Sequence, residues 1–198
     1  MINKMYNLAP FSKLHNYALI CICILAMTYP AEGRSMPDVS KAFGDVEFQT
    51  THLKPLKLNS FEGKIIILFF GYTHCPDICP TALLDISKTL KELGRDAALV
   101  QPIFISVDYK RDKPEILEQY VKFFDERIIG ISSNKLNIDK ISKYFKINYS
   151  LLNSQSENYL VEHSSNLYVI DKDLIVKKII PNGLPSTEIT KAIKKLIN

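Results

Sequence analysis

Residues 65–80 read Ile65-Ile66-Ile67-Leu68-Phe69-Phe70-Gly71-Tyr72-Thr73-His74-Cys75-Pro76-Asp77-Ile78-Cys79-Pro80. The stretch begins with a continuous apolar run rich in β-branched and aromatic side chains, which predicts a central strand buried on both faces. Pro80 suits the first turn of a helix, and apolar residues recur over 83–93 until Gly94 ends the pattern. The stretch therefore predicts a strand, a loop with two cysteines, and a helix.

Similar patterns continue to the C-terminus. We expect short strands within 43–58, strands over 99–107, 128–131, 167–170 and 174–176, helices over 114–124, 136–145 and 185–197, and a polar loop over 148–157. Alternating strands and helices that end in a hairpin predict an α/β fold, with a mixed central sheet flanked by helices. Because a dithiol between the first core strand and its helix is typical of thioredoxin-like folds, we expect that fold.

Length and composition limit the possible functions. The 198 residues suffice for one substantial domain, and 46% hydrophobic with 23% charged residues is typical of globular proteins. The net charge is +4, and the lysines are spread along the chain in modest pairs such as Lys177-Lys178 and Lys194-Lys195. We interpret them as solvated faces and expect no nucleic-acid binding, because no dense basic stripe with interleaved aromatic residues is present.

The N-terminal segment resembles a targeting sequence. Lys4 and Lys13 precede an uncharged run, 16–31, which is typical of an export signal with a cleavage site near Ala31-Glu32-Gly33. An uncleaved membrane anchor is the alternative, although the run is shorter than the ~20 residues of a typical spanning helix. We therefore predict a signal peptide or anchor over 1–33, a linker over 34–40 and a domain over 41–198. The domain would be exported to a periplasm-like or intermembrane-type compartment, membrane-associated or soluble after cleavage.

The two cysteines of the expected domain indicate chemistry. A Cys75–Cys79 disulfide would close a loop too short to add much stability, so a chemical role explains the spacing better. The positive end of the helix dipole is expected to stabilise a thiolate at Cys79. Two thiolates suit Cu(I), or zinc if more ligands are added. Cys21 and Cys23 lie in the apolar N-terminal run and are interpreted as small hydrophobic residues.

A third ligand would complete such a site, and His163 is the leading candidate. It lies in a polar step before the strand over 167–170, where a loop of a compact α/β domain can cover the dithiol. His74 is a weaker candidate, because adjacent side chains in an extended chain point in opposite directions. For Asp77 we favour a helix-capping or turn role over tuning of the metal site.

Three blocks of the sequence resemble motifs of the Sco/SenC family of thioredoxin-fold copper proteins and follow one another in the family's order. They are Phe70–Pro80, then Ser106-Val107-Asp108 to Arg111-Asp112 with Pro114-Glu115-Ile116-Leu117, then Tyr159–Ser165 with Tyr168–Asp171. The likeness covers about 41–198. Tyr109 stands where the family has proline and Glu162 where it usually has aspartate, and neither change removes a candidate ligand.

The resemblance implies a copper-binding metallochaperone for copper-site assembly of cytochrome c oxidase, rather than an enzyme with a small substrate. One copper ion, Cu(I) or Cu(II), would be held by Cys75, Cys79 and His163, and Asp112 would assist metal or partner handling. The implied partners are a copper-receiving oxidase subunit and a thiol reductant. Oxidation of Cys75 and Cys79 to a disulfide should exclude copper, because thiolates are the ligands.

A thiol–disulfide oxidoreductase acting on partner cysteines is the alternative. Cys75 would then be the attacking thiol, and His163 would not be required. Common thioredoxin-type redox sites have two residues between their cysteines, whereas this chain has three. A peroxiredoxin-like peroxidase shares the fold but has no further motif in its favour.

Overall fold

The computed structural model describes residues 39–51 and 55–197. The expected signal or anchor over 1–33 and most of the expected linker over 34–40 lie outside the described residues. Of the last two linker positions, Val39 is buried and Ser40 begins a helix. The division into segment, linker and domain therefore stays a prediction.

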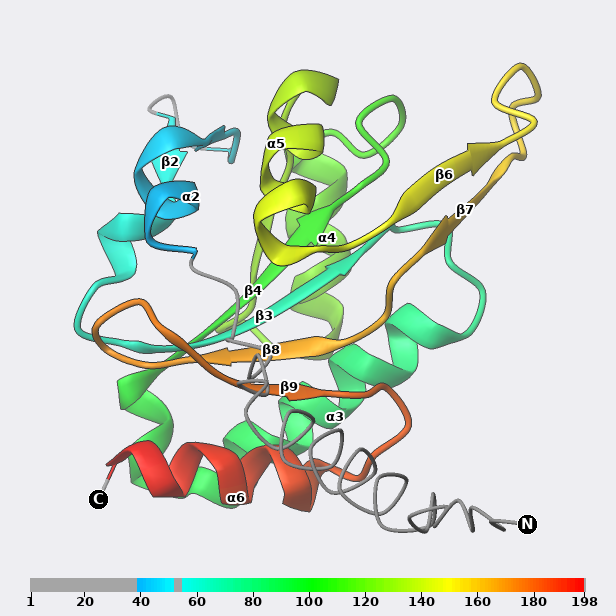
Figure 1. The fold of residues 1–198 in the computed structure, drawn as a ribbon. Coiled ribbons are helices and arrows are strands. Elements are labelled where there is room, and N and C mark those ends of the chain that lie inside the picture. Colours follow the sequence, from blue (N-terminus) through cyan, green and yellow to red (C-terminus); the bar gives the residue numbers. More distant parts are fainter. Residues whose placement is uncertain (1–38, 52–54, 198) are drawn as a thin grey trace, which may run out of the picture. The chain divides into compact units, whose positions relative to one another are not determined.

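A five-stranded mixed sheet forms the centre of the described domain (Figure 1). Its strand order is β5 (Ile129–Ile131), β4 (Val100–Ser106), β3 (Ile65–Gly71), β8 (Leu167–Ile170) and β9 (Val176–Ile180). The first three run parallel, whereas β8 is antiparallel to both β3 and β9. Every residue of β3 is buried, as expected of a middle strand covered on both faces.

Helices cover both faces of this sheet. The helix α3 (Ile78–Leu93) contacts α4 (Pro114–Phe124) and α6 (Ser186–Ile197), and Figure 1 shows α5 (Lys135–Phe145) on the other side of the sheet from α3 and α6. The prediction of a thioredoxin-like α/β fold is confirmed. Among the described residues, no helix is long and apolar enough to cross a membrane.

The Gly94 expected to end the first core helix does so, at a φ of 57°. This left-handed conformation favours glycine. The chain then forms a short 3-10 helix, η2 (Gly94–Leu99), before it enters β4.

Three aromatic rings connect the sheet to α5. Phe70 of β3, Phe145 of α5 and Tyr168 of β8 have centroids 5.0–6.0 Å apart, and each pair is tilted or edge-to-face. Such pairs add about 0.5–1.5 kcal/mol to the effect of burial. The cluster holds α5 against the two central strands.

The N-terminal part of the domain differs from the expected run of short strands. Phe43 lies in the helix α2 (Ser40–Asp45), and short strands, β1 (Glu47–Phe48) and β2 (Leu56–Lys57), follow together with the 3-10 helix η1 (Leu58–Phe61). Phe43 is fully buried, with its ring 6.4 Å from that of Phe145. A six-residue helix is too short to show a helical period in the sequence.

Only part of the polar loop expected over 148–157 is a loop, because residues 149–152 form a strand and residues 153–157 lie in the turn that follows it. The strands β6 (Tyr149–Leu152) and β7 (Leu160–His163) form an antiparallel hairpin that extends beyond the main sheet (Figure 1). Its residues alternate between exposed and at least partly buried positions, so it lacks a strong apolar signal. The expected polar step at His163 is the end of β7.

Gly71, the last residue of β3, provides a test of how closely the sheet packs against α3, the helix that carries Cys79. A Cβ atom there would lie 2.7 Å from both Cys79 Sγ and a ring carbon of Phe104. Gly71→Ala should therefore lower the free energy of unfolding by about 1–3 kcal/mol, measured by urea unfolding.

Gly44→Ala is the matched control, because a Cβ atom there meets nothing within 4 Å and the residue lies in α2. It should leave stability unchanged or raise it by up to about 1 kcal/mol. Equal effects of the two substitutions would contradict the close packing at Gly71.

Candidate metal centre

The two cysteines lie where β3 passes into α3. Cys75 is on the intervening loop and half-buried, whereas Cys79 is the second residue of α3 and fully buried. Both thiols are free, and the Cys79 backbone N–H donates to Cys75 Sγ at 3.4 Å. The first turn of the helix therefore directs an amide donor at the sulfur of the preceding loop.

The pKa values of the two thiols are shifted in opposite directions. The Cys79 thiol, the amides of Asp77 and Cys79, and His163 stabilise the Cys75 thiolate and lower its pKa to about 5, against partial burial. The hydrogen bond to Cys75, together with burial, raises the pKa of Cys79 well above its usual range. In the metal-free dithiol these shifts favour the thiolate at Cys75, whereas the sequence predicts one at Cys79.

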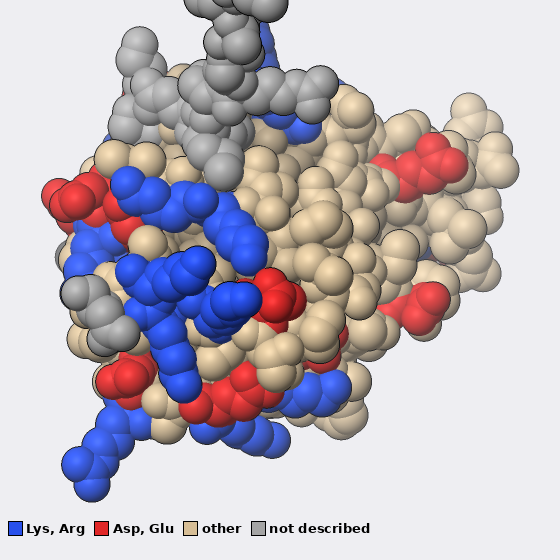
Figure 2. Space-filling view, turned by 60° about the horizontal axis from the view of Figure 1, so that its bottom comes forward, with Lys and Arg blue, Asp and Glu red and all other residues tan. Residues whose placement is uncertain are grey.

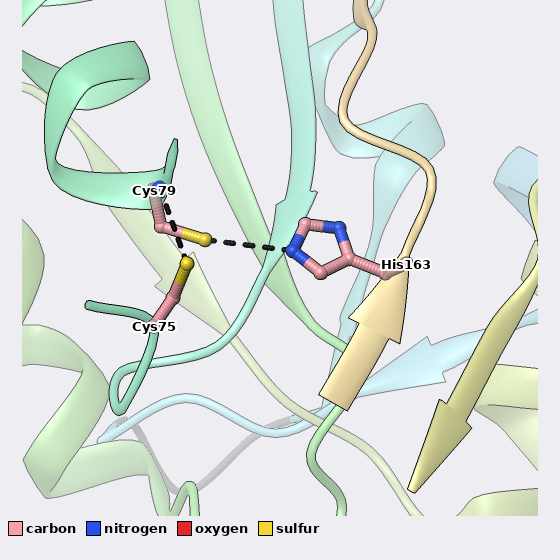
Figure 3. A group of neighbouring side chains, drawn as sticks. All are labelled: Cys75, Cys79 and His163. Atoms are coloured by element: carbon pink, nitrogen blue, oxygen red, sulfur yellow. Dashed lines mark hydrogen bonds between the residues drawn. The ribbon is translucent and has the colours of Figure 1, made fainter. Parts of the chain in front are cut away.

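His163 is brought to the dithiol by the end of β7. Its Nε2 lies 3.6 Å from Cys79 Sγ, and Figure 3 shows the imidazole directed at the two sulfurs. Its Nδ1 lies 3.0 Å from the carbonyl oxygen of Ser164. A proton assigned to Nδ1 would donate to that carbonyl and leave the Nε2 lone pair free to bind a metal.

Two aromatic rings fix the plane of this imidazole. Tyr72 packs edge-on against it at a centroid distance of 5.8 Å, and Phe69 does so at 6.4 Å. Both come from β3 or the residue after it, so the strand that leads to the cysteines also supports the histidine. No pattern in the sequence indicates this role, because Phe69 reads only as part of the buried apolar run and Tyr72 as part of the loop that follows it.

The resulting group has two sulfur atoms and one imidazole nitrogen, all within 4.8 Å of one another. Thiolate and imidazole are ligands that suit Cu(I), and zinc sites usually contain a fourth ligand. The donor set therefore fits a soft metal ion, and a copper ion in particular.

Asp112 anchors the loop that carries Cys75. It is buried, and its carboxylate accepts hydrogen bonds from the Thr73 N–H at 2.9 Å, the Thr73 hydroxyl at 2.6 Å and the Ser106 hydroxyl at 2.6 Å. Burial raises its pKa in spite of these bonds. Asp112 therefore holds the cysteine loop to the end of β4, and it is not one of the convergent donor residues.

A second buried carboxylate, in the loop between β4 and α4 that also carries Asp112, holds the hairpin that carries His163. Asp108 accepts hydrogen bonds from the Tyr159 hydroxyl and, at 2.6 Å, from Arg111 Nε. The Arg111 guanidinium also lies 3.5 Å above the Tyr159 ring. The loop between β4 and α4 thus contacts both segments that supply the candidate ligands.

Asp77 and His74, the other residues considered from sequence, lie outside the group. Asp77 occupies the N-cap position of α3, but its exposed side chain forms no capping hydrogen bond, and its backbone amide is what faces Cys75. His74 is exposed and lies near Thr73 and Asp112, with Nδ1 3.0 Å from the Thr73 hydroxyl. It is not among the three convergent donors.

The fold and this group define a thioredoxin-like protein with a dithiol–imidazole centre. A family model described as SCO1/SenC matches residues 35–198, and the chain belongs to that family, as its three sequence blocks predicted.

Relatives from bacteria and yeast share this similarity. A SCO2-like protein of Rickettsia prowazekii is 38% identical over 117 residues, which cover 58% of this chain and 57% of that protein. Protein SCO2, mitochondrial, of Saccharomyces cerevisiae is 36% identical over 145 residues, which cover 69% of this chain and 48% of that protein. The chain therefore spans about half the length of these relatives.

Solved structures share the fold. ScoI of Bradyrhizobium japonicum with copper bound has a TM-score of 0.70 and 31% identity, with 76% of this chain and 96% of that chain covered. ScoI of Arabidopsis thaliana with copper bound has a TM-score of 0.71 and 28% identity, with coverages of 77% and 95%.

The low pKa of Cys75 predicts its reactivity. In the reduced metal-free protein, the alkylation rate of Cys75 by iodoacetamide should be half-maximal at about pH 5 and decline below it, because the thiolate is the nucleophile. Cys79→Ala removes the strongest stabilising contact and should move this midpoint to higher pH. Mass spectrometry of the labelled peptide measures both. A wild-type midpoint near that of an unperturbed thiol, about 8.5, would contradict the assignment.

Proposed function

We propose that this protein binds one copper ion through Cys75, Cys79 and His163 and supplies it to the copper site of cytochrome c oxidase during assembly. The observation that carries the proposal is the convergence of two sulfurs and one imidazole nitrogen within 4.8 Å. Membership of the SCO1/SenC family supports it, as do the related ScoI structures described as copper-bound.

The residues of the site have distinct roles in copper uptake. Cys75 is already a thiolate near neutral pH, so it supplies the first anionic donor. Cys79 must release its proton when it becomes a ligand. Its sulfur would then bind the copper ion instead of donating a hydrogen bond to Cys75. His163 contributes Nε2 while Ser164 accepts from Nδ1–H. When bound, copper would be a soft cation held for transfer to other thiolate and imidazole ligands.

Oxidation provides control over loading. Because Cys75 is already a thiolate, loss of two electrons and the single proton of Cys79 forms a Cys75–Cys79 disulfide, which has no thiolate to bind copper. A dithiol reductant must then return two electrons and one proton to the pair before copper binds. We assign the protein two kinds of partner, a copper-receiving oxidase subunit and a thiol reductant.

We place the domain in an exported compartment where such partners meet. Relatives of this chain include proteins named as mitochondrial and a SCO1/SenC family lipoprotein of Bacillus anthracis. The apolar run within 1–33 supports export or anchoring of this chain as well.

The shifted thiol pKa values favour a second candidate function, thiol–disulfide exchange with partner cysteines. Cys75 combines a low pKa with partial exposure, which suits an attacking thiol, and the buried Cys79 would be the resolving thiol. In that reaction Cys75 attacks a partner disulfide and releases one partner thiolate, which leaves a mixed disulfide. Cys79 then attacks the sulfur of Cys75 and releases the second partner thiolate, so the partner is reduced and the Cys75–Cys79 disulfide forms. His163 is dispensable for this exchange, so its removal separates the two functions.

Copper binding by the reduced full-length protein tests the proposal. Competition with a chromophoric Cu(I) chelator should give one Cu(I) per chain, and His163→Ala should weaken binding by at least about tenfold, or ~1.4 kcal/mol, because one donor is lost. His74→Ala is the matched control, since it removes a histidine next to Cys75 that does not point to the sulfurs.

The control should bind copper as the wild type does, and the diamide-oxidised wild type should bind none. Circular dichroism checks that each variant is folded. Equal affinities of the wild type and His163→Ala would contradict the three-ligand site. A wild type that reduces a disulfide substrate but binds no Cu(I) would overturn the copper function in favour of the second candidate.

A further inference from the structure

The lysine pairs that are separate in the sequence lie on one face of the folded domain. Figure 2 shows lysine and arginine side chains gathered on part of the face that includes α6, next to a broad uncharged area. The lysine face, as we call it, consists of Lys177 and Lys178 of β9 and Lys191, Lys194 and Lys195 of α6.

Two shallow hollows adjoin these lysines. One, of about 590 Å³, is lined by Thr187 and Thr190 together with the three α6 lysines and Glu92. The other, of about 320 Å³, lies between α6 and β9 and is lined in part by Lys177 and Lys178. Lys191 and Lys195 border both hollows, so a partner that contacts these two lysines lies over both hollows.

Part of this positive charge has no ion-pair partner among the described residues. Lys177 pairs with Asp171 at 3.0 Å and Lys178 with Glu188 at 3.6 Å. Across residues 39–51 and 55–197, no ion pair is formed by the three lysines of α6. Glu92 lies in the first hollow, and its two carboxylate oxygens accept hydrogen bonds from the Ser186 and Thr190 hydroxyls. These bonds, with a smaller contribution from Lys194, lower the pKa of Glu92, so the charge of Lys194 is partly balanced there.

Helix stability alone does not explain this arrangement. Lys194 and Lys195 are in the last turn of α6, where cations stabilise the negative end of the helix dipole. Lys191 lies before that turn, and Lys177 and Lys178 are on a strand, so the dipole gives no reason for their position. The three lysines of α6, which form no ion pair among the described residues, are therefore open to an anionic partner.

We propose that the lysine face docks on the anionic phospholipid headgroups of the membrane next to the domain. A lipid surface presents many phosphates in one plane, which matches exposed lysines spread over two adjoining shallow hollows better than one deep pocket would. The predicted export signal or anchor over 1–33 would place the domain within reach of such a surface. Docking would hold the domain in one orientation at the membrane, and it requires no copper.

Lysine footprinting of the full-length, copper-free chain tests this proposal. The chain is reconstituted in vesicles of phosphatidylcholine alone or with phosphatidylglycerol, and a water-soluble acetylating reagent followed by mass spectrometry reports each lysine. Labelling of Lys191, Lys194 and Lys195 should fall about fivefold in the anionic vesicles, the factor that corresponds to one lysine charge near such a surface. High salt, which shortens the screening length to about 3 Å at 1 M, should restore it.

Lys143 and Lys146 are the internal control. They are exposed at the end of α5, on the other side of the sheet from α6, and should be labelled equally in both vesicles. Lys191→Glu/Lys195→Glu should abolish the protection of Lys194, whereas Lys143→Glu/Lys146→Glu should leave it unchanged.

Equal labelling of the lysine face in both kinds of vesicle would overturn the proposal. Protection by soluble polyglutamate but not by the vesicles would also overturn it, and would assign the face to an acidic protein. Protection by inorganic phosphate alone, at the same phosphate concentration, would reduce the face to an anion site. None of these outcomes depends on copper, so the proposed copper function stands or falls separately.

Discussion

The candidate centre depends on two buried carboxylates in the loop between β4 and α4. Asp112 accepts two hydrogen bonds from Thr73, two residues before Cys75, and Asp108 accepts one from Tyr159, four residues before His163. Without its partners, a buried carboxylate costs roughly 1–3 kcal/mol or more, so these bonds hold the segments firmly. One short loop thus positions the cysteine loop and the histidine hairpin relative to each other.

The asymmetry of the two thiols explains how one site suits both metal and redox chemistry. Cys75 is partly exposed and anionic, while Cys79 is buried and keeps its proton by donating to Cys75. A metal ion that replaces this shared proton gains a second thiolate, and an oxidant that removes two electrons closes the pair. His163 distinguishes the two outcomes, because an imidazole Nε2 held next to the sulfurs serves a metal and is not needed for disulfide exchange.

Strong local patterns in the sequence predicted the core of this fold. The apolar run before the cysteines and the periodic residues after Pro80 gave β3 and α3, since a fully buried strand and an amphipathic helix each leave a clear pattern. The short helix around Phe43 and the half-exposed hairpin that ends at His163 leave no clear pattern in the sequence. His163 itself was identified by its chemistry and by the family resemblance, although the strand that carries it was missed.

Other features of the site arise from contacts that sequence patterns do not encode. Thr73 and Asp112 are 39 positions apart, and no local signal indicates their hydrogen bonds. The place of Cys79 at the helix start predicts a thiolate there, but its hydrogen bond to Cys75, together with burial, raises the pKa of Cys79 instead. The lysine pairs 177–178 and 194–195 gave no hint of a common face, because β9 and α6 bring them together only in the folded chain.

The central claim is that two thiolates and one imidazole form a single copper site. X-ray absorption at the copper edge of the reduced, Cu(I)-loaded full-length protein tests it most directly. We predict a first shell of two sulfur ligands and one nitrogen ligand, with the nitrogen and its imidazole scattering lost in His163→Ala. A wild-type spectrum with sulfur ligands alone, or one that His163→Ala leaves unchanged, would contradict the claim.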